Sequence, residues 1–121
     1  MIDAVGKLRF GNTNVVVDID QAVCNYYFAL IPKYYCASPQ MWRAHITVVR
    51  TGIETWPRCM NFLDGSEIAF SYENTVRYVP PYFFIRVYSD QIGRIRQSMG
   101  MTFYSRRFDC FHITVANTKA N

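Results

Sequence analysis

The chain has 121 residues, of which half are apolar and 17% are aromatic, and its formal net charge is +4. This length fits one domain, and the apolar content excludes an intrinsically disordered chain. No apolar run approaches the roughly 18 residues that a membrane helix needs, and residues 1–7 lack the basic and apolar blocks of a signal peptide. We therefore expect a single cytoplasmic domain over residues 1–121 with no membrane partner.

The first half of the chain alternates strand and helix signals. Apolar periodicity predicts two strands, a helix, a third strand and a short helical turn, in this order: residues 8–10, 14–18, 21–30, 44–50 and 54–63. Asp20 precedes the helix and is expected to cap it, because its carboxylate can accept from the free N–H groups of the first turn. Pro32 ends the helix, and a loop over residues 34–42 leads to the third strand.

The second half predicts three strands, a helix and two more strands, in this order: residues 68–72, 75–79, 82–88, 91–99, 101–104 and the segment around 112–115. The first two of these strands should pair as a hairpin through a turn at residues 73–74. Asp90 is expected to cap the helix and Gly100 to end it. A turn is expected at residues 106–107.

The tetrapeptide His-Ile-Thr-Val occurs twice, at residues 45–48 and 112–115, and it contains the only two histidines of the chain. In a strand, residues i and i+2 point to the same face, so each His shares a face with its Thr while Ile and Val point into the core. A lone His in a strand is usually a hydrogen-bonded structural residue. The duplication favours a function in which two imidazoles and two hydroxyls face a common space.

The elements around the tetrapeptide repeat as well. An Asp-Gln helix start precedes the histidine by 25 residues in the first half (Asp20 to His45) and by 22 in the second (Asp90 to His112). The repeat predicts two strand–helix–strand units related by a pseudo-twofold axis. Such symmetry would place the two tetrapeptide strands side by side at the centre of the molecule.

Two H-x-T motifs, one in each half, resemble the two-histidine (2H) phosphoesterases. This superfamily includes RNA 2′,3′-cyclic phosphodiesterases, RNA ligase-like enzymes and the bacteriophage anti-CBASS nucleases that cleave cyclic oligonucleotide signals. The spacing of 67 residues between the histidines is most similar to the compact phage type. The resemblance implies an α+β fold of two pseudo-symmetric strand–helix–strand lobes with antiparallel sheets around a central cleft.

The resemblance also implies the chemistry. It assigns four catalytic residues, which are His45, Thr47, His112 and Thr114. One imidazole would deprotonate the nucleophile and the other would protonate the leaving oxygen, while the hydroxyls hydrogen-bond the phosphate. This scheme needs no metal and no cofactor. The sequence leaves open which histidine is the base and whether the nucleophile is water or a ribose 2′-hydroxyl.

Candidate substrate-binding residues follow from strand parity. Alternation over residues 82–88 places four side chains on one face: Tyr82, Phe84, Arg86 and Tyr88. On that face, aromatic rings could stack on bases and Arg86 could pair with a phosphate. The alternative, in which this face packs against a helix or faces solvent, is at least as well supported. Arg43 has the same parity as His45 and Arg50 does not, so only Arg43 would point towards the substrate. A solvated strand end is the favoured alternative for Arg43.

Three functions remain open at this point. Ten of the thirteen basic residues are Arg, which suits an anionic ligand that carries bases. The first function is hydrolysis of a cyclic nucleotide or oligonucleotide, with phage counter-defence as its setting. The second is opening of 2′,3′-cyclic phosphates at RNA ends. The third, of another class, is a non-catalytic module that binds a nucleotide or RNA.

A metal site is not expected. The four cysteines are widely spaced and include no C-x-x-C pair: Cys24, Cys36, Cys59 and Cys110. No carboxylate or thiol is spaced to complete a site around either histidine. The oligomeric state stays open, and a homo-oligomer is compatible with the sequence.

Overall fold

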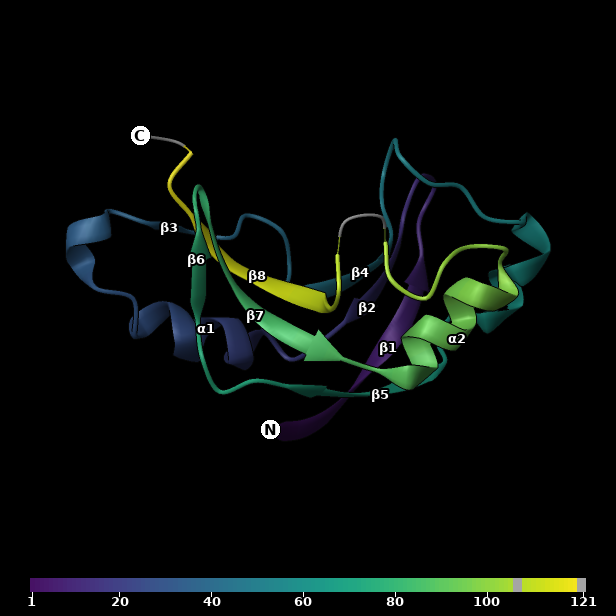
Figure 1. Ribbon diagram of the computed structural model, residues 1–121, viewed down its shortest axis with the longest axis horizontal. Coiled ribbons are helices and arrows are strands. Elements are labelled where there is room, and N and C mark those ends of the chain that lie inside the picture. The colour runs from purple at the N-terminus through teal and green to yellow at the C-terminus, as the bar shows by residue number, and fades with distance from the viewer. Residues whose placement is uncertain (106–107, 120–121) are drawn as a thin grey trace.

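The computed structural model describes residues 1–105 and 108–119, and its regular structure is mainly antiparallel strand (Figure 1). The strands are β1 (Ile2–Phe10), β2 (Val15–Asp18), β3 (Ser38–Pro39), β4 (His45–Val49), β5 (Glu67–Tyr72), β6 (Arg77–Val79), β7 (Tyr82–Tyr88) and β8 (Phe111–Asn117). The helices are α1 (Gln21–Ala29) and α2 (Asp90–Ser98), and two short 3₁₀ helices are η1 (Lys33–Tyr35) and η2 (Arg58–Leu63).

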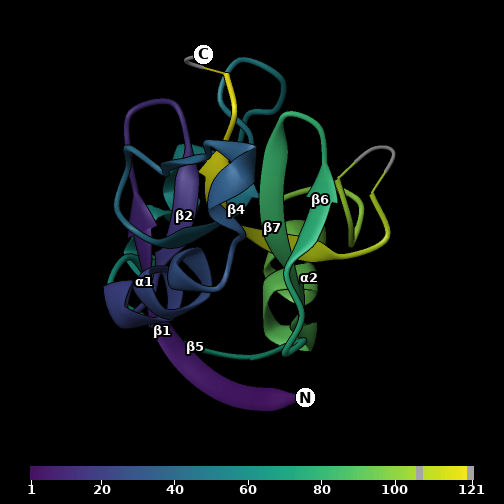
Figure 2. The ribbon, with the colours of Figure 1, turned by 90° about the vertical axis from the view of Figure 1, so that its left-hand side faces the viewer.

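Six of the strands close into a barrel. β1 pairs with β2 and β5, β2 pairs with β4, β4 pairs with β8, and β7 joins β8 to β5, always antiparallel. The short strands β3 and β6 extend this sheet from β8 and β7. The two helices lie at opposite ends of the molecule (Figure 1), and Figure 2 views it from the end where α1 lies.

The predicted α+β fold of two strand–helix–strand lobes around a central cleft is wrong. β8 pairs with β4 from the first half of the chain and with β7 from the second half. β5 likewise pairs with both β1 and β7. Because these pairings join the halves into one ring, the strands form a single closed sheet and the two halves do not form separate lobes.

One face of each barrel strand fills the interior. The alternation is clear on the two tetrapeptide strands, where Ile46 and Ile113 are fully buried and Val48 and Val115 are 1% exposed. Both helices contribute to the same core, through Cys24 and Tyr27 of α1 and Ile92 of α2. Complete burial of such aliphatic side chains stabilises the fold by about 1.5–3 kcal/mol each. Because successive side chains of a strand point to opposite faces, the residues between these buried ones point outwards.

The helix starts are set by local side chains. Asp20 caps α1 as predicted, and its carboxylate accepts from the Ala22 N–H at 2.9 Å. The predicted Asp90 cap is wrong, because the Ser89 hydroxyl accepts from the Ile92 N–H at 3.2 Å. Asp90 lies in the first turn, where its negative charge interacts favourably with the helix dipole.

Among the described residues, no helix has both the length and the apolar character needed to cross a membrane.

Several other predicted elements need correction. The hairpin between residues 68–72 and 75–79 does not form, because β6 pairs with β7 while β5 pairs with β1 and β7. Residues 101–104 are not a strand, and Phe103 and Tyr104 pack as a pair of rings 4.8 Å apart. The first strand begins at Ile2 instead of residue 8. The turn predicted at residues 106–107 lies outside the described residues.

Candidate functional site

The two tetrapeptide strands are neighbours, which confirms the predicted side-by-side arrangement. β4 and β8 run antiparallel with Ile46 opposite Ile113. This register puts His45 across from Thr114 and Thr47 across from His112. We call His45, Thr47, His112 and Thr114 the quartet.

All four quartet side chains share the outer face of the barrel. Each is half-buried, whereas the isoleucine between each His and Thr points into the core. The two histidines are diagonal neighbours across the strand pair, and such residues lie roughly 7–8 Å apart, with their Cβ atoms somewhat closer. A local twofold axis through the paired isoleucines relates the two halves of the quartet.

Each tetrapeptide strand carries a β-bulge immediately after its threonine. The register of β2 against β4 shifts so that Val48 is the extra residue, and the register of β7 against β8 shifts in the same way at Val115. A bulge breaks the alternation of faces, so Val48 and Val49 are both buried. The next residue, Arg50, is thereby returned to the side of the quartet.

A buried ion pair holds the bulge of β4. The Arg96 guanidinium is inaccessible to solvent, and it donates to the Val48 carbonyl at 2.5 Å and to the Thr102 carbonyl at 2.9 Å. It also donates to both carboxylate oxygens of Glu54, at 2.9 and 2.6 Å. These hydrogen bonds from Arg96 are the main reason that the pKa of Glu54 is lowered. Glu54 in turn accepts from the backbone N–H of Arg50 at 3.2 Å.

The orientation of His45 is fixed through one ring nitrogen. Its Nδ1 lies 2.6 Å from the Arg43 carbonyl oxygen. Since a carbonyl only accepts, Nδ1 carries the hydrogen, and Nε2 is the ring nitrogen left for another partner. Asp18 lies beside His45 on β2, but its carboxylate accepts from Arg9 at 2.7 and 3.2 Å. The orienting partner of His45 is therefore a backbone carbonyl.

His112 occupies a more crowded position. Its ring contacts two aromatic rings, with centroid distances of 5.7 Å to Phe84 and 5.3 Å to Phe108. Burial lowers the pKa of His112, and the positive charges of Arg50 and His45 lower it further. These effects favour the neutral imidazole at neutral pH.

The two quartet hydroxyls are available to a ligand. Within residues 1–105 and 108–119, neither the Thr47 nor the Thr114 hydroxyl has a hydrogen-bond partner in the protein. The backbone of Thr114 is anchored separately, because its carbonyl accepts from the Cys24 thiol of α1 at 3.7 Å. Each hydroxyl can therefore donate to, or accept from, a group bound on the outer face.

The structure places Phe84 and Arg86 beside the quartet, on the same outer face of the sheet. Phe84 lies opposite Thr114, and Arg86 lies opposite His112. The Arg86 guanidinium is already engaged, since it donates to Asp109 at 2.9 Å and to the Cys110 sulfur at 3.4 Å. These contacts raise the pKa of Arg86, and the hydrogen bond from Arg86 lowers the pKa of Asp109.

Tyr82 and Arg43 lie near the starts of β7 and β4. Tyr82 is at the start of β7, opposite Asn117, and the Lys119 ammonium lies 4.7 Å from the centre of its ring. Arg43 precedes β4 and is exposed. It contacts His45 through its carbonyl oxygen.

Arg50 and Phe108 also flank the quartet, and sequence reasoning missed both. The Arg50 guanidinium carbon lies 5.1 Å from the centre of the Phe108 ring, which itself contacts His112. Strand parity excluded Arg50 because it assumed unbroken alternation through residues 44–50. The consecutive apolar pair Val48-Val49 was the available signal that the alternation fails. Phe108 precedes β8 in a loop, and no local pattern marks it.

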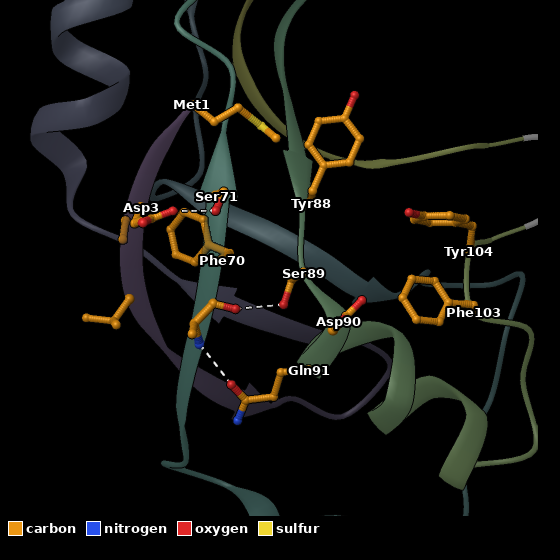
Figure 3. A pocket seen from close by; sticks show the side chains of 13 residues that line it. Met1, Asp3, Phe70, Ser71, Tyr88, Ser89, Asp90, Gln91, Phe103 and Tyr104 are labelled. Carbon is orange, nitrogen blue, oxygen red and sulfur yellow. Dashed lines mark hydrogen bonds between the residues drawn. The ribbon is translucent and has the colours of Figure 1, made fainter.

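A separate open cavity of about 1060 Å³ lies beyond β7. Figure 3 shows Tyr88, Asp90, Phe103 and Tyr104 around it, with the hydrogen bond from Ser71 to Asp3 on its other side. None of the quartet residues lines this cavity. The quartet is thus a surface site on the barrel wall, distinct from the cavity.

Among the described residues, no three His, Cys, Asp or Glu side chains gather so that they could hold a metal ion. Comparisons of the chain with protein-family models, with curated proteins and with solved structures found no match. A functional assignment therefore depends on the geometry of the quartet, together with the resemblance of its two H-x-T motifs.

Proposed function

We propose that this protein is a metal-independent phosphodiesterase that hydrolyses cyclic nucleotides or cyclic oligonucleotides. The observation that carries the proposal is the pairing of β4 with β8, which presents two imidazoles and two unbonded hydroxyls on one accessible face. Two histidines on either side of a phosphodiester can perform both proton transfers of a displacement at phosphorus. The two imidazoles and two hydroxyls can therefore carry out the proposed reaction without a metal.

The environments of the histidines suggest a division of roles. His112 has a lowered pKa, so it is the better candidate for the base that takes the proton of water or of a ribose hydroxyl as the new P–O bond forms. His45 keeps its Nδ1–H bond to the Arg43 carbonyl in either charge state. Its Nε2 can therefore carry a proton and transfer it to the leaving oxygen as the old P–O bond breaks.

The threonines would act on the phosphate itself. The Thr47 and Thr114 hydroxyls can donate to the non-bridging oxygens, where negative charge builds up in the transition state. The rings of Phe84 and Phe108 both contact His112 and offer apolar ring surface near the reacting group. Base–aromatic stacking is worth about 1–3 kcal/mol per base, so these rings favour a substrate that carries nucleobases.

The test is a substrate panel assayed in EDTA between pH 5 and 9. It contains cyclic mono-, di- and trinucleotides and an RNA with a 2′,3′-cyclic phosphate end. We expect a cyclic substrate to be linearised by the native protein and not by a His45→Ala/His112→Ala variant purified in parallel, which controls for contaminating nucleases. Exclusive cleavage of the RNA end would support the RNA-processing alternative. Binding without turnover of any substrate would refute the enzyme and favour a binding module.

A further inference from the structure

Among the residues that the structure describes, the Arg50 guanidinium forms no direct ion pair, although its charge acts at longer range on Glu54 and is one of the lesser causes of the lowered pKa of that carboxyl. In the described part of the chain, its guanidinium lies within ion-pair distance of no carboxylate and donates no side-chain hydrogen bond. The carboxylates on neighbouring elements are each paired with another arginine: Asp18 with Arg9, Glu54 with Arg96, and Asp109 with Arg86. Arg50 and the two histidines therefore form a patch where an anion is electrostatically favoured.

Arg50 is also held in place by its backbone and by one ring. The bulge at Val48 brings it to the quartet face, and Glu54 accepts from its backbone N–H. Its guanidinium packs on the Phe108 ring, which contacts His112. A cation over an aromatic face gains electrostatic attraction without using its N–H donors. The five donors of Arg50 thus stay free in a defined position next to His112.

We propose that Arg50 binds the phosphate that the quartet acts on, an assignment that rests on the proposed phosphodiesterase function, and that Phe108 positions it. A guanidinium can donate two parallel hydrogen bonds to a phosphate, which gives orientation as well as affinity. Arg86, the arginine that the sequence favoured for this role, is engaged by Asp109 and Cys110. Arg50, in contrast, lies against Phe108 beside His112 with its donors available.

Binding of inorganic phosphate tests the proposal without turnover. The chain has two histidines, so their Cε1 proton signals can be followed individually by NMR as phosphate is added. We compare the native protein with Arg50→Gln and with Arg94→Gln, which removes the same charge from an exposed position on α2. Loss of a charge-assisted pair should weaken phosphate binding about ten- to a hundredfold in Arg50→Gln, while Arg94→Gln should bind like the native protein.

Two results would overturn the assignment: native protein whose histidine signals do not respond to phosphate, or an Arg50→Gln variant that binds phosphate as tightly as the native protein. Phe108→Leu should weaken phosphate binding several-fold and Phe108→Tyr should restore it, because the ring acts only as a platform. The Arg50→Gln variant should also shift the titration of His112 to higher pH, since a positive neighbour has been removed.

The failure of this assignment can be separated from the failure of the proposed function. If the native protein cleaves a cyclic substrate but Arg50→Gln leaves kcat/KM and KM unchanged, the assignment is wrong and the phosphodiesterase stands. If no substrate is cleaved while phosphate binding still depends on Arg50, the enzymatic function is wrong and the anion site stands.

Discussion

Replacement of Arg96 by Met should destabilise the protein strongly and disturb the quartet. Met keeps an unbranched stem of similar length but has no donor, so the Glu54 carboxylate, 15% exposed, loses its partner. The carbonyls of Val48 and Thr102 also lose their guanidinium donors. Breaking a buried ion pair by removing one partner costs about 3–5 kcal/mol. For a domain of this size, that loss lowers Tm on the order of 10–20 °C.

Urea unfolding followed by circular dichroism measures the loss directly. The matched control is Arg94→Met, two residues earlier on α2, where the side chain is exposed and the expected change is within about 0.5 kcal/mol. A loss below about 1 kcal/mol in Arg96→Met, within the range of an exposed ion pair, would refute the role given to the buried pair.

The difference in free energy of unfolding between native protein and Arg96→Met should also depend on pH, which provides a second check. Arg96 lowers the pKa of Glu54 in the folded protein, so the stability from this ionisation is fully present above the ordinary glutamate value of 4.5. It is lost as pH falls through the lowered folded pKa. The stability gap between native protein and Arg96→Met should therefore narrow on acidification below pH 4.5. A gap that stays constant or widens there would contradict the ion-pair explanation.

Three further predictions concern the quartet and the packing of α2. Thr47→Val and Thr114→Val should each lower kcat on the order of a hundredfold with little effect on stability, as measured by steady-state kinetics and thermal unfolding; equal kcat values would remove the hydroxyls from the chemistry. The value of kcat/KM should rise with pH as His112 loses its proton, at a pKa below the ordinary histidine value, and a rate that falls through that range would exclude His112 as the base. Gly93→Ala should lower the free energy of unfolding in urea by about 1–3 kcal/mol, because the added Cβ would overlap the Phe103 ring; unchanged stability would show that this ring moves freely.

Features that depend on local chemistry could be predicted from the sequence. Residues 82–88 form β7 with the predicted bounds, because alternating apolar residues define a half-buried strand wherever it pairs. The Asp20 cap also depends only on a carboxylate two residues before the N–H that it accepts from. The shared face of His45 and Thr47, and of His112 and Thr114, follows from the same two-residue period.

Features that depend on distant pairings could not be predicted. The ring closes through a short contact between β5 and β7, in which Ser71 pairs with Tyr88 and Tyr72 with Val87. Nothing local in these residues selects β7 over the β6 strand that follows β5 directly. The repeated order of strand, helix and strand therefore suggested two lobes, whereas hydrogen bonding between the halves produces one barrel.

The bulges explain what sequence reasoning missed at the site. Parity along residues 44–50 placed Arg50 on the core side, but the extra residue at Val48 reverses the faces beyond it. The Arg96 donor that satisfies the Val48 carbonyl is 48 positions away in the sequence. The position of Arg50 beside the quartet thus depends on a bulge that is held by a long-range contact. Strand periodicity alone assigned Arg50 to the wrong face.

A double-mutant cycle on the two histidines tests the shared site most directly. Single-turnover rates on the best cyclic substrate, in EDTA, are compared for native protein, His45→Ala, His112→Ala and the double variant. We expect each single substitution to lower the rate about 10²–10⁴-fold. The double variant should be hardly slower than the poorer single one, because the imidazoles serve one displacement. Losses that multiply independently, or a single variant with the native rate, would contradict a paired action of His45 and His112 on one phosphate.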